Sequence, residues 1–162
     1  SKFRLHGTNR QFVKYLLSRV TGFLDQKAGA STNFTTYFLS PGSRPFEVEH
    51  IWANKFAEHQ DEFQQQHEFD AYRNRIGDLL LLPQGTNQSY GAKIYAEKVG
   101  HYLKENVLAK SLHQGAYENN PNFTGMAQVL GIKFKAHSQF KKLDIDERQA
   151  LLQSICELVW GT

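Results

Sequence analysis

Hydrophobic residues recur at helical spacing in three parts of the chain. From about Asn9 to Gln26 they form one stripe along a predicted helix, and Thr8 is expected to cap its start. A second helix is predicted from Ile94 to Asn106, and a final amphipathic helix is predicted to begin at Asp144. These segments account for most of the apolar periodicity, so the pattern favours a fold dominated by helix.

Two short segments between these helices have the pattern of β-strands. Residues 46–51 alternate between apolar and charged side chains, and residues 79–82 are four consecutive leucines followed by Pro83. The leucine run is typical of a short buried strand, and a buried helical turn is the alternative. Residues 53–70 are polar and predict an insertion or a weakly packed helix, and a short extended stretch is expected at residues 37–39. The predicted fold class is therefore α+β, mostly helical, with a small β-hairpin at its centre.

Composition narrows the class of protein. A chain of 162 residues that is 40% hydrophobic is suited to one compact domain, and a net charge of +3 is compatible with a nucleic-acid partner without requiring one. Cys156 is the only cysteine, which excludes a disulfide framework or a CxxC zinc site within the chain and favours a cytoplasmic location. No apolar run approaches the roughly 20 residues of a membrane span. Because the chain starts at Ser1 without a methionine, we expect it to be part of a longer protein.

Candidate chemistry centres on the end of the first predicted strand. There Glu49 and His50 offer a carboxylate for a hard cation beside an imidazole that titrates near neutral pH. A hairpin would bring them near Asp78, with Asn74 four residues earlier, and Asn87 would follow at the start of the next helix. Such a unit can hold one Mg²⁺ on two protein oxygens while the imidazole takes a proton from water, which is phosphodiesterase chemistry. The alternative is a solvated or hydrogen-bonded histidine at a strand end.

Three blocks of the sequence resemble the HNH domain (ββα-metal, His-Me finger) of GmrSD-type restriction endonucleases. The blocks are FEVEHIW at Phe46–Trp52, YRNRIGDLLLLP at Tyr72–Pro83 and NQSYG at Asn87–Gly91. The similarity continues at residues 14–19, 95–98 and 146–149, and so covers nearly the whole chain. The resemblance implies a single nuclease domain over residues 1–162. Within it, a ββα-metal core over 46–105 lies between an N-terminal helical part (1–30) and a C-terminal helical part (106–162).

The resemblance also implies roles for individual residues. His50 matches the general base, Glu49 the metal-binding acid before it, and Asn87 the final HNH position and second ligand of Mg²⁺ or Mn²⁺. In the family an asparagine directly before the leucine run accepts a hydrogen bond from Nδ1–H of the base and directs Nε2 at water. Here that position is Asp78, which is favoured by position, and Asn74 is the rival.

The resemblance further implies an N-terminal NTP-binding, ParB-like domain as partner and DNA as substrate. The expected function is metal-dependent cleavage of foreign or modified DNA in phage defence. A non-catalytic DNA-binding module on the same scaffold, and an RNase, are the alternatives. Six lysines are candidates for contact with phosphates, and solvated surface charge is the alternative for each of them. They are Lys93, Lys98, Lys133, Lys135, Lys141 and Lys142.

Overall fold

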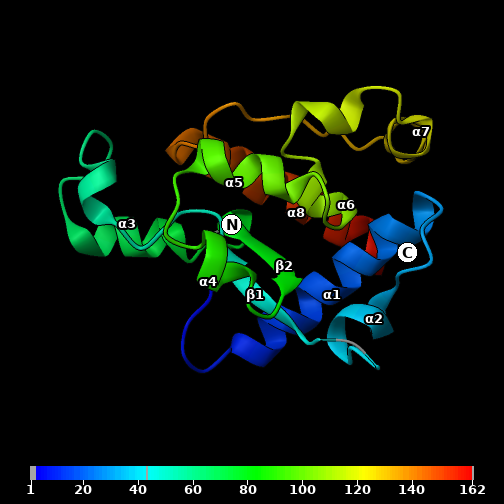
Figure 1. The fold of residues 1–162 in the computed structure, drawn as a ribbon, viewed down its shortest axis with the longest axis horizontal. Helices are drawn as coiled ribbons and strands as arrows, with labels where there is room; N and C mark the ends of the chain where they lie inside the picture. The colour runs from blue at the N-terminus through cyan, green and yellow to red at the C-terminus, as the bar shows by residue number, and fades with distance from the viewer. Residues whose placement is uncertain (1–2, 43, 162) are drawn as a thin grey trace.

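The computed structural model describes residues 3–42 and 44–161, apart from the side chain of Asn87. It is a mostly helical α+β fold around a two-stranded antiparallel sheet, as the sequence predicts (Figure 1). The α-helices are α1 (Arg10–Lys27), α2 (Phe34–Phe38), α3 (Gln66–Arg73), α4 (Thr86–Tyr90), α5 (Tyr95–Tyr102), α6 (Val107–Lys110), α7 (Pro121–Leu130) and α8 (Lys142–Trp160). Short 3₁₀ turns are η1 (Phe56–His59), η2 (Ile76–Asp78) and η3 (Gln114–Tyr117).

The sheet consists of β1 (Phe46–His50) and β2 (Leu79–Pro83). In its register Glu49 lies opposite Leu80 and His50 lies opposite Leu79. All four leucines of β2 are buried, and adjacent strand residues point to opposite faces, so both faces of β2 are covered. This explains why the leucine run forms a strand without polar alternation. It also leaves the end of β1, with Glu49 and His50, as the polar end of the hairpin.

Helix α1 packs beside the strands (Figure 1). Its position agrees with the predicted helix, and its buried stripe runs through Val13, Leu17 and Val20. The predicted cap at Thr8 is wrong, because the helix begins after Asn9 without a side-chain cap.

The predicted extended stretch near residues 37–39 is also wrong. Those residues belong to or directly follow α2, because Asn33 caps that helix by accepting a hydrogen bond from the backbone N–H of Thr36 at 3.1 Å. The last helix begins at Lys142, slightly earlier than predicted. Asp144 lies in its first turn and accepts a hydrogen bond from the backbone N–H of Lys141 at 2.7 Å.

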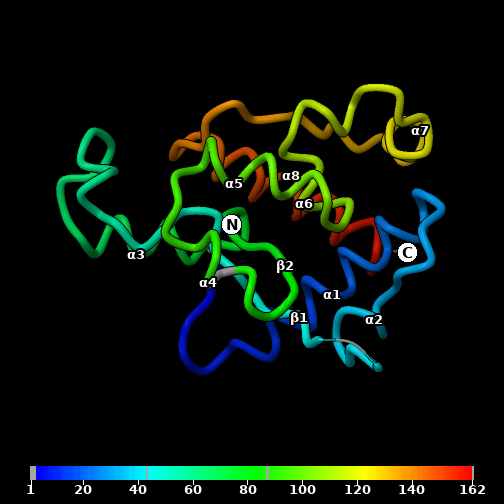
Figure 2. Tube along the Cα trace, viewed as in Figure 1, coloured from blue at the N-terminus to red at the C-terminus, as the bar shows by residue number. Residues whose placement is uncertain are grey.

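The polar segment between the strands, residues 53–70, contributes buried aromatic side chains to the core. It includes Phe63 and Phe69, which are buried and lie within 6 Å of the Trp52 ring, centroid to centroid. These aromatic contacts anchor α3, which leads from an outlying part of the molecule back towards the sheet (Figure 2). The segment therefore ends in a fixed position beside β1.

Helix α8 closes the core behind η2. Gly77 permits this approach, since a Cβ atom there would lie 2.5 Å from the carbonyl oxygen of Ile145. The buried apolar residues form one cluster that extends in sequence from Leu5 to Ile155. No helix among the described residues is long and apolar enough to cross a membrane.

Candidate functional site

His50 lies at the end of β1 and makes a side-chain hydrogen bond to Asn74, the residue that follows α3. Its Nε2 atom lies 2.8 Å from Asn74 Oδ1. The carboxamide of Asn74 is itself oriented, because its Nδ2 donates to the backbone oxygen of Asp70 at 2.9 Å. The oxygen of the amide therefore faces the imidazole, and Nε2 must carry the hydrogen of the His50–Asn74 bond. Nδ1 is left with its lone pair.

This contact decides which of the two rival residues lies against the imidazole, and it reverses the expected ring orientation. Asn74, not Asp78, is the partner of His50, and the bond uses Nε2 where the resemblance implied Nδ1. Burial, followed by the charge of Arg73, lowers the pKa of His50 to about 4, and the Asn74 bond partly opposes this. His50 is consequently neutral at pH 7, the protonation state that a general base requires.

Glu49 lies next to His50 and is a buried carboxylate without a partner. Only 7% of its surface is exposed, and its carboxylate makes no hydrogen bond or ion pair with any residue that the structure describes. Burial, with a contribution from the nearby Glu47, raises the pKa of Glu49 to about 7. An unpaired carboxylate of this kind is costly unless a cation neutralises it, so its chemistry fits a metal ligand.

Asp78 and Lys98 lie behind the chain that follows His50. The Asp78 carboxylate accepts from the backbone N–H of Trp52 at 3.1 Å, and its backbone oxygen accepts from the N–H of Ile51 at 2.7 Å. From the other side, the Lys98 ammonium donates to the Ile51 oxygen at 2.8 Å and more weakly to the His50 oxygen at 3.5 Å. Together they fix the backbone on which the imidazole is carried.

The side chains of Asp78 and Lys98 are both buried. Burial raises the pKa of the Asp78 carboxyl well above its usual range and lowers the pKa of Lys98 to about 8. Lys98 is only 2% exposed, so the prediction that it contacts DNA is wrong. A signal for this was present in the sequence, because Lys98 is four residues before the apolar Tyr102 and so lies on the same helix face.

Two arginines near His50 were not identified from the sequence. Arg73, the last residue of α3, donates from Nε to the Trp52 oxygen at 3.0 Å. Arg10 opens α1, and its charge acts on both Glu49 and His50. Arg10 lies outside the three blocks of the resemblance, whereas Arg73 lies within the second block, directly before the candidate Asn74, and was assigned no role there.

Comparison with known proteins identifies the family. Residues 1–155 match the family described as GmrSD restriction endonucleases, C-terminal domain. The chain belongs to this family. The resemblance found in the sequence is thereby confirmed, and it places the chain in a restriction endonuclease context. No curated protein and no solved structure matches the chain.

The third block of the GmrSD resemblance is only partly visible. Asn87 lies in α4, which directly follows β2 as expected, but its side chain is outside the described residues. Its predicted role as a metal ligand therefore rests on the sequence. Glu49 is the predicted ligand whose side chain the structure describes.

The remaining lysines predicted to contact DNA differ in whether they already have an interaction partner within the protein. Lys135 pairs with Glu147 at 3.2 Å, Lys141 pairs with Asp61 at 2.8 Å, and Lys142 lies over the rings of Phe63 and Tyr72. Lys93 is exposed, and its Nζ lies 3.9 Å from Glu97 Oε2, which makes a long and weak surface ion pair. Lys133 is exposed and makes no ion pair with the described residues.

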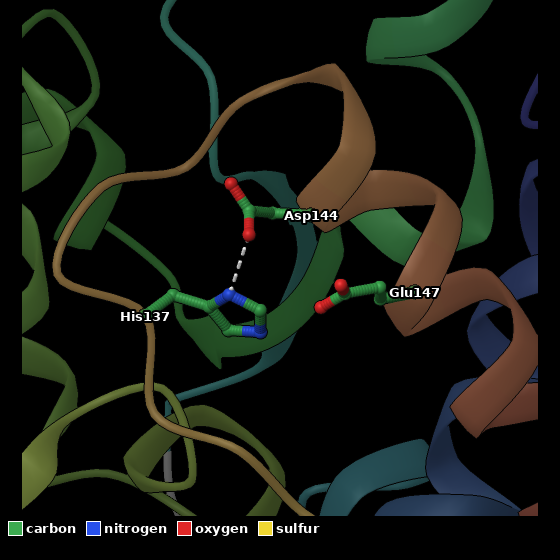
Figure 3. Close-up of side chains that lie close together, drawn as sticks. All are labelled: His137, Asp144 and Glu147. Atoms are coloured by element: carbon green, nitrogen blue, oxygen red, sulfur yellow. Dashed lines mark hydrogen bonds and ion pairs between the residues drawn. The ribbon is translucent and has the colours of Figure 1, made fainter.

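A second histidine cluster lies at the start of α8. His137, Asp144 and Glu147 each offer one ligand atom within 4.8 Å of the others, and Figure 3 shows the imidazole between the two acids. His137 Nδ1 is 2.9 Å from Asp144 Oδ1. Unlike Glu49, however, both acids already have partners, since Asp144 caps α8 through Lys141 and Glu147 pairs with Lys135.

Proposed function

We propose that this GmrSD-family domain is an HNH-type, Mg²⁺- or Mn²⁺-dependent endonuclease that hydrolyses DNA phosphodiester bonds. The observation that carries the proposal is the oriented imidazole of His50, held through Nε2 by Asn74, and the preceding residue of β1, Glu49, adds a buried carboxylate with no side-chain partner among the described residues. A neutral base with a fixed tautomer and a free carboxylate at the same end of the strand are the two protein components that this chemistry needs.

In the proposed reaction His50 acts through Nδ1. A water molecule attacks the phosphorus, and its proton passes to Nδ1 while the bond from phosphorus to the leaving ester oxygen breaks. The leaving oxygen keeps the bonding electrons and takes a proton from solvent. Asn74 accepts the Nε2–H bond throughout, so it keeps the lone pair of Nδ1 aimed and stabilises the imidazolium that forms. Asp78 and Lys98 contribute by holding the backbone of His50 and Ile51.

Glu49 and Asn87 are the residues proposed to hold the cation. The buried, unpaired carboxylate of Glu49 fits a hard divalent ion, and Mg²⁺ binds through few protein oxygens, leaving positions for water and phosphate. When bound, the ion would stabilise negative charge on the phosphate and on the leaving oxygen.

DNA is proposed as the substrate because the family consists of restriction endonucleases. Exposed Lys93 and Lys133 remain candidates for contact with its backbone, whereas Lys135, Lys141 and Lys142 have competing partners. Recognition of foreign or modified DNA, and control by a nucleoside triphosphate, are proposed to reside in the N-terminal ParB-like domain that the resemblance implies. A cytoplasmic location is proposed because Cys156 is the only cysteine of the chain, as is typical of a reducing compartment.

Nicking of supercoiled plasmid tests this function. The chain is incubated with plasmid in Mg²⁺, in Mn²⁺ and in EDTA, and the same assay is run with His50→Ala. We expect metal-dependent conversion to open-circular or linear DNA that the variant loses. Equal cleavage by His50→Ala would refute the proposal. A parallel digestion of RNA reveals an RNase, and DNA binding without cleavage in either metal indicates the non-catalytic module.

A further inference from the structure

Arg73 combines a fixed position with unused hydrogen-bonding capacity. Its Nε donates to the Trp52 oxygen at 3.0 Å, which fixes the guanidinium two residues beyond His50. A guanidinium has five N–H donors, and this is the one hydrogen bond that the Arg73 side chain makes with the described residues. The side chain is half-buried, so the protein surrounds part of the guanidinium that carries the two Nη groups.

The neighbours of Arg73 place its charge at the candidate site. It directly precedes Asn74, which holds His50, and its Nε donates to the backbone oxygen of Trp52, two residues beyond His50. The carboxylates of Glu49, Asp70 and Asp78 lie near enough to act on Arg73, yet none approaches within 4.0 Å to form an ion pair. The guanidinium is thus fixed on the chain that follows the proposed base, and it forms no ion pair with the acids among the described residues.

Arg75, two residues away, shows what a structural arginine looks like in the same segment. Its Nη1 is 2.8 Å from Asp146 Oδ1, and its guanidinium stacks 3.8 Å above the centre of the Tyr72 ring. Both its charge and its planar face are used within the protein. The contrast indicates that the Nη groups of Arg73 are available to bind a ligand, because they have no acceptor among the described residues.

We propose that Arg73 is a catalytic residue that binds the non-bridging oxygens of the scissile phosphodiester beside His50. A guanidinium presents two parallel N–H groups that match two phosphate oxygens, and it retains its positive charge at any pH of interest. Such a donor, fixed in advance, stabilises the negative charge that grows on the phosphate in the transition state. This inference rests on the proposed function, so its test must separate the two.

The experiment compares Arg73→Ala with the matched control Arg75→Ala in two assays. In Mn²⁺-dependent cleavage of a short DNA duplex, we expect Arg73→Ala to lower kcat by about 100-fold or more, while Arg75→Ala changes it little. Added guanidinium ion is expected to restore part of the Arg73→Ala rate and to leave His50→Ala inactive. In metal-free binding of the same duplex, Arg73→Ala is expected to reduce the slope of log K against log salt by about one.

The outcomes separate the two proposals. If the parent chain cleaves and Arg73→Ala matches Arg75→Ala in rate and salt slope, the role of Arg73 is refuted and the nuclease function stands. If the parent chain does not cleave, the nuclease function fails, and the salt slope alone supports or refutes the phosphate contact. Arg73→Gln, which retains an N–H donor for the Trp52 oxygen, replaces Arg73→Ala if thermal unfolding shows that the alanine variant is not folded.

Discussion

The molecule contains two histidine-centred clusters that look alike in composition and differ in what their partners do. His50 is held by a neutral amide, and the acid beside it, Glu49, has no partner among the residues described. His137 is held by the carboxylate of Asp144, whose other oxygen caps α8. The third member of that cluster, Glu147, pairs with Lys135.

The difference teaches that unsatisfied groups, not residue types, distinguish a chemical site from a structural one. In the His137 cluster each acid already has a hydrogen-bond or ion-pair partner. Burial lowers the pKa of the His137 imidazole, and the positive charge of the buried Arg148 lowers it further. The start of α8 also carries the positive end of a helix dipole, which disfavours a cation. The predictions that follow challenge this contrast by changing matched residues in the two clusters.

The largest expected effect comes from the two histidines. His50→Ala should lower the cleavage rate about 100- to 10,000-fold, because it removes the general base. His137→Ala should cleave at nearly the parent rate per folded molecule, but melt at a lower temperature, because it removes a buried contact with Asp144. Rates and melting curves for both variants check this. Comparable loss of cleavage in folded His137→Ala would erase the distinction.

The partner of His50 should matter next. Asn74→Ala should lower kcat roughly 10- to 100-fold, the usual cost of losing a residue that orients a functional imidazole. Asn74→Asp should retain the bond but raise the pKa of His50, since a carboxylate stabilises the imidazolium. The acid limb of the pH–rate profile would then move to higher pH. An unchanged profile in Asn74→Asp would show that the bond does not act on the base.

Replacing Glu49 and replacing Glu147 should have different effects on the stability of the protein and on its pH dependence. As pH rises from about 4.5 to about 7, an unfolded chain releases the Glu49 proton and the folded chain retains it. Folding stability contributed by Glu49 therefore falls over this window, and Glu49→Gln removes the loss. We expect Glu49→Gln to exceed the parent in stability by roughly 1–3 kcal/mol above pH 7 and by much less at pH 4.5.

Denaturant unfolding in EDTA at both pH values measures this difference, with Glu147→Gln as the matched control. The control should show little change at either pH, because Glu147 is exposed and its ion pair with Lys135 lies at the surface. Mn²⁺ should raise the melting temperature of the parent and of Glu147→Gln, but not of Glu49→Gln. A Mn²⁺ response that is lost only in Glu147→Gln would assign the metal to the other cluster.

The smallest effect is expected at the cap of α8. Asp144→Ala should destabilise the protein by about 0.5–2 kcal/mol, because the backbone N–H of Lys141 loses its acceptor. Cleavage by the folded variant should match that of the parent chain. Thermal unfolding and a plasmid assay at a temperature well below the transition are sufficient to test this.

The sequence predicted the hairpin and its polar end because local patterns determine them. The alternation around Val48, the leucine run and Pro83 define β1 and β2, and the acid–histidine pair at the strand end follows. The sequence could not choose between Asn74 and Asp78. That choice depends on the path of α3, which is fixed by packing of Phe63 and Phe69 on Trp52 and not by any local signal.

Burial of charge was the other feature that local patterns missed. Asp78 and Lys98 were assigned to the site and to the DNA surface, yet both are enclosed and bond to the backbone near His50. Their environment is created by α8 packing against η2 and by Lys98 of α5 reaching the backbone that follows β1, contacts between segments distant in the chain. Arg73 escaped notice for the same reason, since its free donors become visible only when its neighbours are placed.

The most direct test of the account is a crystal structure of the chain soaked with Mn²⁺ and measured for anomalous scattering. We expect a peak within coordination distance of a Glu49 carboxylate oxygen, on the same side as Nδ1 of His50. A peak among His137, Asp144 and Glu147, with none beside Glu49, would contradict it.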